Sequence, residues 1–203
     1  MTIHTFGDSH ASKKYGGWSY CKNVDLKTNR IGALLCYSFG KDPLSRYNIN
    51  KYKVKNGDTI IFCLGEIDCR CHIHKHITKT LTYTNIIDDI VNKYIEAIRI
   101  VIIASQLRLR NVCIYNVIPP VEYNNTKESA QYPFLGSDEE RKQYVLYFND
   151  LLKKKCIENK FIFFDIYDKY TDKNGYLQKD LSDDGVHIKN GIHISDFINQ
   201  NLI

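Results

Sequence analysis

The stretch Thr59–Leu64 (TIIFCL) carries five apolar residues in a row after its first threonine. An apolar run of this length without alternation is typical of a strand that is buried on both faces, as in the middle of a parallel sheet. Val112–Ile118 (VCIYNVI) and Phe161–Ile166 (FIFFDI) have the same character, and Thr2–Phe6 reads as a short strand before them. These runs predict the core strands of a sheet.

Helical patterns lie between the strands. Asn85–Gln106 repeats apolar residues at three-to-four spacing and has Asp88 and Asp89 near its start, which predicts a helix with two acids in its first turn. Ser137 and Glu140 form the pattern of a capping box before a second helix, and Gly191–Asn201 reads as a terminal helix. Strands that alternate with helices predict an α/β fold whose parallel sheet is covered on both faces.

Composition and length fit one soluble globular domain. The chain has 203 residues, of which 43% are hydrophobic and 25% charged, so we expect a single domain over residues 1–203. The net charge of +5 is spread along the chain. Its tightest cluster, Lys153–Lys155, falls near the end of a predicted helix, where cations suit the helix dipole. We therefore expect no nucleic-acid partner.

The compartment is inferred from cysteines and apolar runs. Seven cysteines at irregular spacing favour reduced thiols over a disulfide framework. No basic segment followed by an apolar one opens the chain, and the apolar run Ile100–Ala104 is too short to span a bilayer. We expect a cytoplasmic protein without a membrane partner, and the oligomeric state stays open.

Phe6–His10 (FGDSH) places Ser9 just after the first predicted strand. In parallel sheets covered by helices, ligands bind at the carboxyl ends of the strands. A serine hydroxyl is a weak nucleophile until a base accepts its proton and a third group orients that base. The stretch DDGVH, after the last predicted strand, offers Asp184 and His187 for these two roles. The order Ser, Asp, His is that of other α/β acyl-transfer enzymes.

These residues resemble the blocks of the SGNH (GDSL-type) hydrolase family. Gly7-Asp8-Ser9 matches the first block, and Asp184 with His187 matches the last one. Gly32 is the best match to the isolated glycine of the second block, with Gly40 in reserve. Gly65-Glu66-Ile67-Asp68 aligns with the third block, but Ile67 stands where the family usually has an asparagine.

The resemblance implies a flavodoxin-like, three-layer α/β/α sandwich around a parallel sheet of about five strands. It also implies ester hydrolysis through Ser9, with His187 as general base and Asp184 as its orienting group, and without a cofactor. The backbone N–H groups of Ser9 and Gly32 would bind the oxyanion. Further residues are expected around the same site: His10 lines it, Gly65 and Asp68 border or brace it, and Arg70 and His72 lie within reach of the missing amide.

The substrate class implied by the resemblance is a small acyl ester, with O-acetyl groups on a carbohydrate first. Two alternatives stay open. The same triad would serve a sugar O-acyltransferase, since the outcome depends on how well the site excludes water. The other alternative is a glycan-binding protein that has kept the fold and lost turnover. Ile67 motivates it, because an oxyanion donor is missing there and such a donor stabilises the transition state by about 3 kcal/mol.

Other interpretations of the same residues are weaker. Cys69, Cys71, His72, His74 and His76 are potential zinc ligands, but they are crowded into eight residues without a distant second pair, so no metal is expected. The histidines also lack the apolar spacing of a nucleotide-binding histidine triad. His4 and His10 compete with His187 as base, and Glu66 with Asp68 could form a glycosidase-type pair.

Two aromatic segments complete the candidate site. The connection from Pro119 to Gly136 is longer than ordinary loops and predicts a lid or a binding wall that includes Tyr123, Tyr132, Pro133 and Phe134. Trp18, with Tyr15 and Tyr20, follows the Ser9 loop. These rings fit either stacking on a sugar or covering the core.

Overall fold

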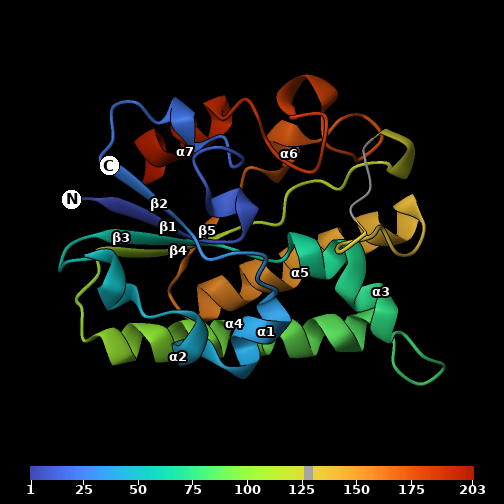
Figure 1. The fold of residues 1–203 in the computed structure, drawn as a ribbon, viewed down its shortest axis with the longest axis horizontal. Coiled ribbons are helices and arrows are strands. Elements are labelled where there is room, and N and C mark those ends of the chain that lie inside the picture. Colours follow the sequence, from blue (N-terminus) through green and yellow to red (C-terminus); the bar gives the residue numbers. More distant parts are fainter. Residues whose placement is uncertain (126–129) are drawn as a thin grey trace.

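The computed structural model describes residues 1–125 and 130–203, and these form a parallel sheet of five strands flanked by helices (Figure 1). The strand order is β2-β1-β3-β4-β5, and each neighbouring pair is parallel. The strands are β1 (Ile3–Gly7), β2 (Leu26–Arg30), β3 (Thr59–Cys63), β4 (Asn111–Tyr115) and β5 (Ile162–Phe164).

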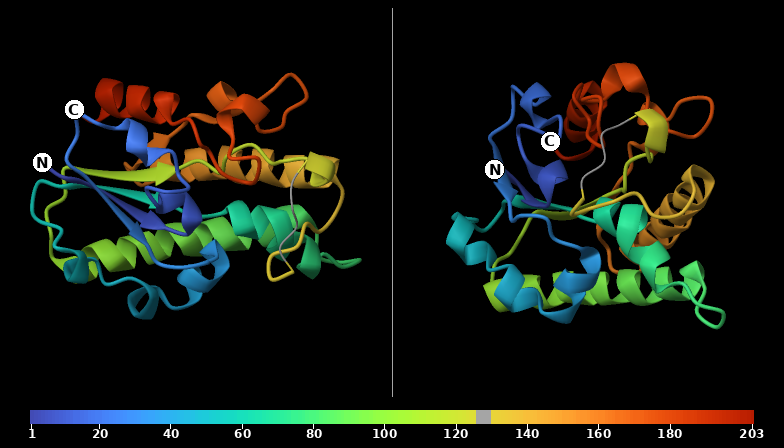
Figure 2. Two further views of the ribbon diagram at one scale, coloured as in Figure 1. Left: turned by 45° about the horizontal axis from the view of Figure 1, so that its top comes forward. Right: turned by 45° about the vertical axis from the view of Figure 1, so that its right-hand side comes forward.

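Helices cover both faces of the sheet, so the expected α/β/α sandwich is confirmed (Figures 1 and 2). One face carries the two long helices together with shorter ones, and the other face carries α6 and α7. The helices are α1 (Cys36–Lys41), α2 (Pro43–Arg46), α3 (Ile73–His76), α4 (Tyr83–Ser105), α5 (Asp138–Glu158), α6 (Tyr167–Tyr170) and α7 (Ile192–Asn201).

The unbroken apolar runs are explained by two separate cores. Ile60 and Phe62 of β3 pack in the core on the side of α4 and α5. Ile61 and Cys63 pack in the other core, with Ile194 of α7. Successive side chains of a strand point to opposite faces, and here both faces are buried, so no position needs a polar residue.

Capping residues set where the two long helices begin. Ser137 and Glu140 form the predicted capping box at the start of α5. The first long helix begins at Tyr83, because Thr82 and Asn85 make a capping box there. The expectation that two acids occupy its first turn is therefore wrong, since Asp88 and Asp89 lie one turn further along.

The strand β2 is not predicted by its sequence. Leu26-Lys-Thr-Asn-Arg30 has one apolar residue, because β2 lies at the sheet edge, pairs with β1 and is partly exposed along its length. Edge strands carry polar and charged residues where central strands cannot. β2 ends at Arg30, beside Gly7 of β1.

Two further features concern the chain as a whole. All seven cysteines are free thiols, in agreement with the absence of a disulfide framework. Among the described residues, none of the helices combines the length and the apolar character that crossing a membrane requires.

Candidate active site

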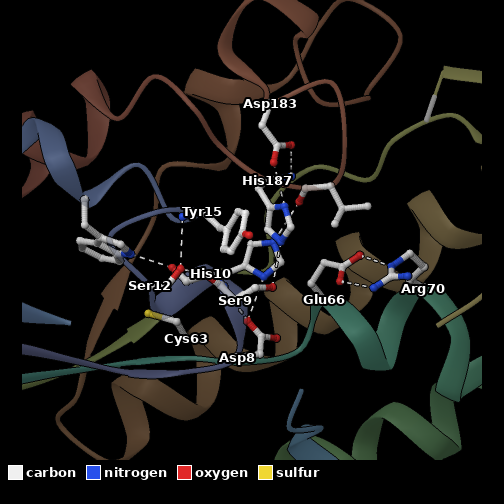
Figure 3. A network of polar contacts seen from close by, with 12 residues as sticks. Asp8, Ser9, His10, Ser12, Tyr15, Cys63, Glu66, Arg70, Asp183 and His187 are labelled. Carbon is white, nitrogen blue, oxygen red and sulfur yellow. Dashed lines mark hydrogen bonds and ion pairs between the residues drawn. The ribbon is translucent and has the colours of Figure 1, made fainter. Parts of the chain in front are cut away.

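The turn that carries Ser9 is set by Gly7. β1 ends at Gly7, which lies beside Cys63 of β3, and Ser9 opens a short helical turn, Ser9–Ala11. A Cβ on Gly7 would lie 1.9 Å from the Cys63 carbonyl oxygen, so only glycine allows the two strands to approach this closely. The Asp8 carboxylate accepts the His10 backbone N–H at 2.8 Å and fixes the turn (Figure 3).

Ser9 and His187 meet as expected from their places at the carboxyl side of the sheet. The Ser9 hydroxyl oxygen lies 2.8 Å from the Nε2 atom of His187, although 178 positions separate the two residues (Figure 3). This distance is that of a hydrogen bond between a nucleophile and its base.

The acid beside His187 is Asp183, so the assignment of Asp184 is wrong. The Oδ2 atom of Asp183 lies 3.0 Å from Nδ1 of His187, the ring nitrogen that faces away from Ser9 (Figure 3). Asp184 lines a different pocket, together with Asp172 and Lys179. The hydrogen-bonded series therefore runs from Ser9 through His187 to Asp183.

The backbone explains the difference of one position. Ser182 and Ile188 pair as an antiparallel bridge, and the Asp183 N–H donates to the His187 carbonyl at 3.0 Å. Asp183 and His187 are therefore opposed across a tight turn. Asp184 lies inside that turn with φ of 62°, a left-handed conformation that aspartate tolerates better than most residues.

His187 is poised as a neutral base. Burial of its ring and the cation on His10 lower the pKa of His187, and the carboxylate of Asp183 opposes them only in part. The direction of this shift keeps the imidazole unprotonated at neutral pH, and a general base must be unprotonated.

His10 joins the Ser9 turn to the His187 loop. Its Nδ1 lies 2.9 Å from Oδ1 of Asp8, and its Nε2 lies 2.9 Å from the carbonyl oxygen of Val186. Both partners are acceptors, so both ring nitrogens carry protons and the side chain is an imidazolium. Burial alone would lower the pKa of His10, but the contacts with Asp8 outweigh it and raise the pKa to about 9.

A cleft of about 370 Å³ lies over Ser9 and His187. Its described walls come from five segments that lie far apart in the sequence. Tyr132 and Phe134 belong to the long connection expected to form a binding wall, of which residues 126–129 lie outside the described part. The lining residues are Ser9, Tyr15, Arg30, Ala33, Ile67, Arg70, Tyr132, Phe134, Gly185, Val186 and His187.

Arg70 lines the cleft but its charge is matched. Its Nε and Nη2 atoms donate to the two carboxylate oxygens of Glu66 at 2.6 and 3.1 Å, and Nη1 donates to the Tyr132 carbonyl oxygen. Arg70 thus ties the end of β3 to the long connection. Glu66 is committed to this pair, so the suggested carboxylate pair of Glu66 and Asp68 does not form.

Neither Asp68 nor His72 lines the cleft, which corrects the expectation for His72, whereas Asp68 braces a neighbouring segment. Asp68 is fully buried and accepts the N–H groups of Cys36 at 2.7 Å and Tyr37 at 3.2 Å, so it caps α1. Burial raises the pKa of Asp68 to about 7. The His72 ring packs against Tyr37 and His76, with centroids 4.5 Å away in each case. A helical turn after β3 rotates both side chains away from Ser9.

The three candidate glycines have different surroundings. Gly32 follows Arg30 in the loop after β2, with φ of 114° and open space where a side chain would be. A Cβ on Gly65 would lie 2.6 Å from Val117, so Gly65 is required for packing after β3. Gly40, the reserve candidate, packs against Lys93 of α4. None of these three glycines is among the described residues that line the cleft.

The aromatic residues near the Ser9 loop divide between core and cleft. Trp18 is buried, packs on Tyr115 and Phe164 and donates its indole N–H to the His10 carbonyl at 2.6 Å. It covers the core and is unable to stack on a substrate. Tyr15 lines the cleft, with its ring centroid 5.1 Å from that of His187.

The remaining histidines and thiols do not form a second site in the described part of the chain. His4 is buried on β1, where its Nε2 atom lies 3.4 Å from Oδ2 of Asp58. It therefore does not serve as the base for Ser9. No three histidine, cysteine or acidic side chains among the described residues are placed to hold a metal ion.

Comparisons with known proteins place the fold. No protein-family model matches the chain, and no curated protein sequence matches it either. Among solved structures, the chain is similar to a Streptococcus pneumonia protein described as a platelet activating factor, with 18% identity, a TM-score of 0.68 and coverage of 100% of this chain and 84% of that one.

Two further structures share the fold. A GDSL-like lipase from Bacteroides thetaiotaomicron has 13% identity and a TM-score of 0.66, with 98% of this chain and 86% of that one covered. An acetylxylan esterase from Geobacillus stearothermophilus has 10% identity and a TM-score of 0.54, with 98% and 93% covered. The parallel sheet, its order and these similarities show that the chain adopts the fold of the SGNH (GDSL-type) hydrolases.

Proposed function

We propose that the protein is a serine ester hydrolase in which Ser9 is the nucleophile. The observation that carries the proposal is the hydrogen-bonded series of Ser9, His187 and Asp183, which opens onto the cleft of about 370 Å³. Nucleophile, base and orienting acid are the three parts that an activated serine requires.

The reaction follows from these contacts. As the Ser9 oxygen forms a bond to the ester carbonyl carbon, Nε2 of His187 accepts the hydroxyl proton. The bond to the alcohol oxygen then breaks, and His187 gives that proton to the leaving alcohol. Water, deprotonated by His187, then attacks the acyl carbon, the bond to the Ser9 oxygen breaks, and His187 returns the proton to Ser9 as the acid leaves. Throughout, Asp183 stabilises the imidazolium form of His187 through Nδ1.

The oxyanion would be bound mainly by backbone groups. We assign the N–H groups of Ser9 and Gly32 to this role, because they border the carboxyl ends of β1 and β2. Ile67 lines the cleft without a polar group, and three N–H groups of Arg70 are already used by Glu66 and Tyr132. The site therefore has one side-chain donor fewer than is usual for its fold.

The preferred ester in this proposal is an O-acetyl group on a carbohydrate. Tyr15, Tyr132 and Phe134 line the cleft, and aromatic rings suit the apolar faces of sugars. A cleft of about 370 Å³ also falls in the size range of small-molecule sites. The fold is shared with an acetylxylan esterase, which supports this choice of substrate class.

The experiment is turnover of 4-nitrophenyl acetate by the wild type and by Ser9→Ala, with Ser12→Ala as the matched control. Ser12 lies on the same loop and donates its hydroxyl to the Ser9 carbonyl rather than facing His187. We expect the Ser9 variant to lose at least about a thousandfold in kcat. Equal rates in wild type and Ser9→Ala would refute the proposal.

A glycan-binding protein without turnover is the second candidate, and Ile67 is the observation that favours it. The two functions are separated by a fluorophosphonate probe, which labels only an activated serine. Labelling of Ser9 in the wild type, lost in His187→Ala, supports the hydrolase. Carbohydrate binding without any labelling supports the binding protein.

A further inference from the structure

Among the described residues, Arg30 is the cation of the cleft lining that has no counter-ion. It lines the cleft together with Ser9 and His187, is exposed, and forms no ion pair with the described residues. Arg70, the other arginine of the lining, is matched by Glu66. The described lining residues include no aspartate or glutamate. The described lining of the cleft therefore carries an unmatched positive charge at Arg30.

The strand register holds Arg30 close to the nucleophile. Arg30 pairs with Gly7 in the parallel ladder of β1 and β2, and the Ile31 N–H donates to the Gly7 carbonyl at 2.8 Å. Neighbouring strands are about 4.8 Å apart. Since Gly7 precedes Ser9 by two positions, the end of β2 lies directly beside the Ser9 turn.

Tyr15 links Arg30 to the catalytic histidine of the proposed function. The Arg30 guanidinium carbon lies 5.9 Å from the centre of the Tyr15 ring, within the range of a cation–π contact. The same ring lies 5.1 Å from the His187 ring. Lys14 lies 4.7 Å from the centre of this ring and adds a second positive charge. The Tyr15 ring thus contacts both Arg30 and His187.

We propose that Arg30 binds an anionic group of the substrate, so that the preferred ester carries a carboxylate or phosphate near the scissile bond. This inference rests on the proposed function, and it narrows the substrate to an acidic sugar or another anionic ester. Arginine suits this role because its planar fork pairs with two oxygens of such a group. A free cation beside a reaction centre also attracts anionic ligands from solution.

Two pairs of esters test the proposal and locate the charge. In the first pair, 3-acetoxybenzoate carries a carboxylate on its alcohol half and phenyl acetate is its neutral counterpart. In the second pair, 4-nitrophenyl hydrogen succinate carries a carboxylate on its acyl half and 4-nitrophenyl acetate is its neutral counterpart. For at least one pair, we expect wild type to prefer the anionic ester. In Arg30→Met that preference should fall about tenfold in the ratio of kcat/KM values, which corresponds to about 1.4 kcal/mol.

Lys27→Met is the matched control. Lys27 lies on the same strand, is exposed and is absent from the cleft lining, so its loss removes the same charge without touching the site. It should leave the preference unchanged. Arg30→Lys should retain part of the preference, and added salt should weaken it in the wild type. Absence of any preference for an anion, or equal loss in Arg30→Met and Lys27→Met, would overturn the proposal.

A binding measurement separates this proposal from the hydrolase function. Calorimetry with D-glucuronate and with glucose does not depend on turnover. We expect tighter binding of glucuronate by wild type and by Ser9→Ala, and loss of that difference in Arg30→Met. If no ester is turned over but glucuronate binds through Arg30, the hydrolase fails and the anion site stands. If esters are hydrolysed and glucuronate binds no better than glucose, the anion site fails alone.

Discussion

The Nε2 atom of His10 lies 2.9 Å from the carbonyl oxygen of Val186, and this contact spans 176 positions of the chain. Val186 directly precedes His187, and His10 directly follows Ser9. The ring centroids of His10 and His187 are 4.9 Å apart. One buried imidazolium therefore both holds the two halves of the candidate site together and places a positive charge beside its base.

The first prediction concerns the pH dependence of activity in His10→Gln. The cation on His10 lowers the pKa of His187, so removing it should raise that pKa. Because the base must be neutral, the acid limb of kcat/KM should then move to higher pH, and activity at pH 6 should fall more than at pH 8. The introduced glutamine amide can still donate to the Val186 carbonyl, so the geometry is partly kept. His193→Gln, outside the cleft lining, is the control. An acid limb that stays at its wild-type pH would contradict the electrostatic role.

The second prediction concerns stability. The pKa of His10 is raised from 6.5 to about 9 in the folded chain. A raised pKa means that the stabilisation is complete below the unfolded value near 6.5 and is lost as the pH rises through about 9. We expect the free energy of unfolding to fall by on the order of 3 kcal/mol between pH 6.5 and 9.5 because of this group. Urea titrations should show this decline reduced in His10→Gln. Parallel curves for the two proteins would refute the prediction.

The third prediction separates the two neighbouring acids of the DDGVH turn. Asp183→Asn should lower kcat by at least about a hundredfold, because the amide no longer stabilises the imidazolium and can favour the wrong tautomer. Asp184→Asn is the matched control, since its side chain does not face His187 and asparagine tolerates the left-handed backbone found there. Its kcat should stay within about twofold of the wild-type value. Steady-state kinetics that rank the two variants in the opposite order would place the orienting acid at Asp184 after all.

The fourth prediction concerns Ile67, which lines the cleft where the family usually has an amide donor. Ile67→Asn should raise kcat by up to about a hundredfold if the new amide reaches the oxyanion, since such donors are worth about 3 kcal/mol. Ile67→Leu keeps the apolar surface and should give no increase. Burst-phase kinetics with 4-nitrophenyl acetate would show whether the gain lies in acylation. No gain in the asparagine variant, with its fold intact, would mean that other donors already complete the site.

The sequence predicts the central strands because each is buried on both faces, as the two cores around β3 show. It does not predict β2, whose polar residues at the sheet edge look like those of a loop. The consequence is functional, because Arg30 enters the cleft only through the pairing of β2 with β1. No local sequence pattern predicts that pairing.

At the site, the sequence predicts the meeting of Ser9 and His187 but not the details around them. The sequence DDGVH does not show which of its two aspartates faces the His187 ring across the turn. In the structure Asp183 does, and Asp184 takes the left-handed backbone conformation within the turn. Likewise, the helical turn after β3 sends Asp68 into the cap of α1. Both depend on backbone angles and tertiary contacts that residue identity alone does not set.

The order of the elements along the chain has a consequence for biosynthesis. Ser9 precedes β2 to β5, whereas His187 follows them all, so a ribosome would deliver every strand of the sheet before it delivers the base. Until the last loop has docked, the serine of a nascent chain is an ordinary, unreactive alcohol. Hydrolytic power would therefore arise in the final stage of folding, and a fragment cut after α6 would keep all five strands but have no base for its serine.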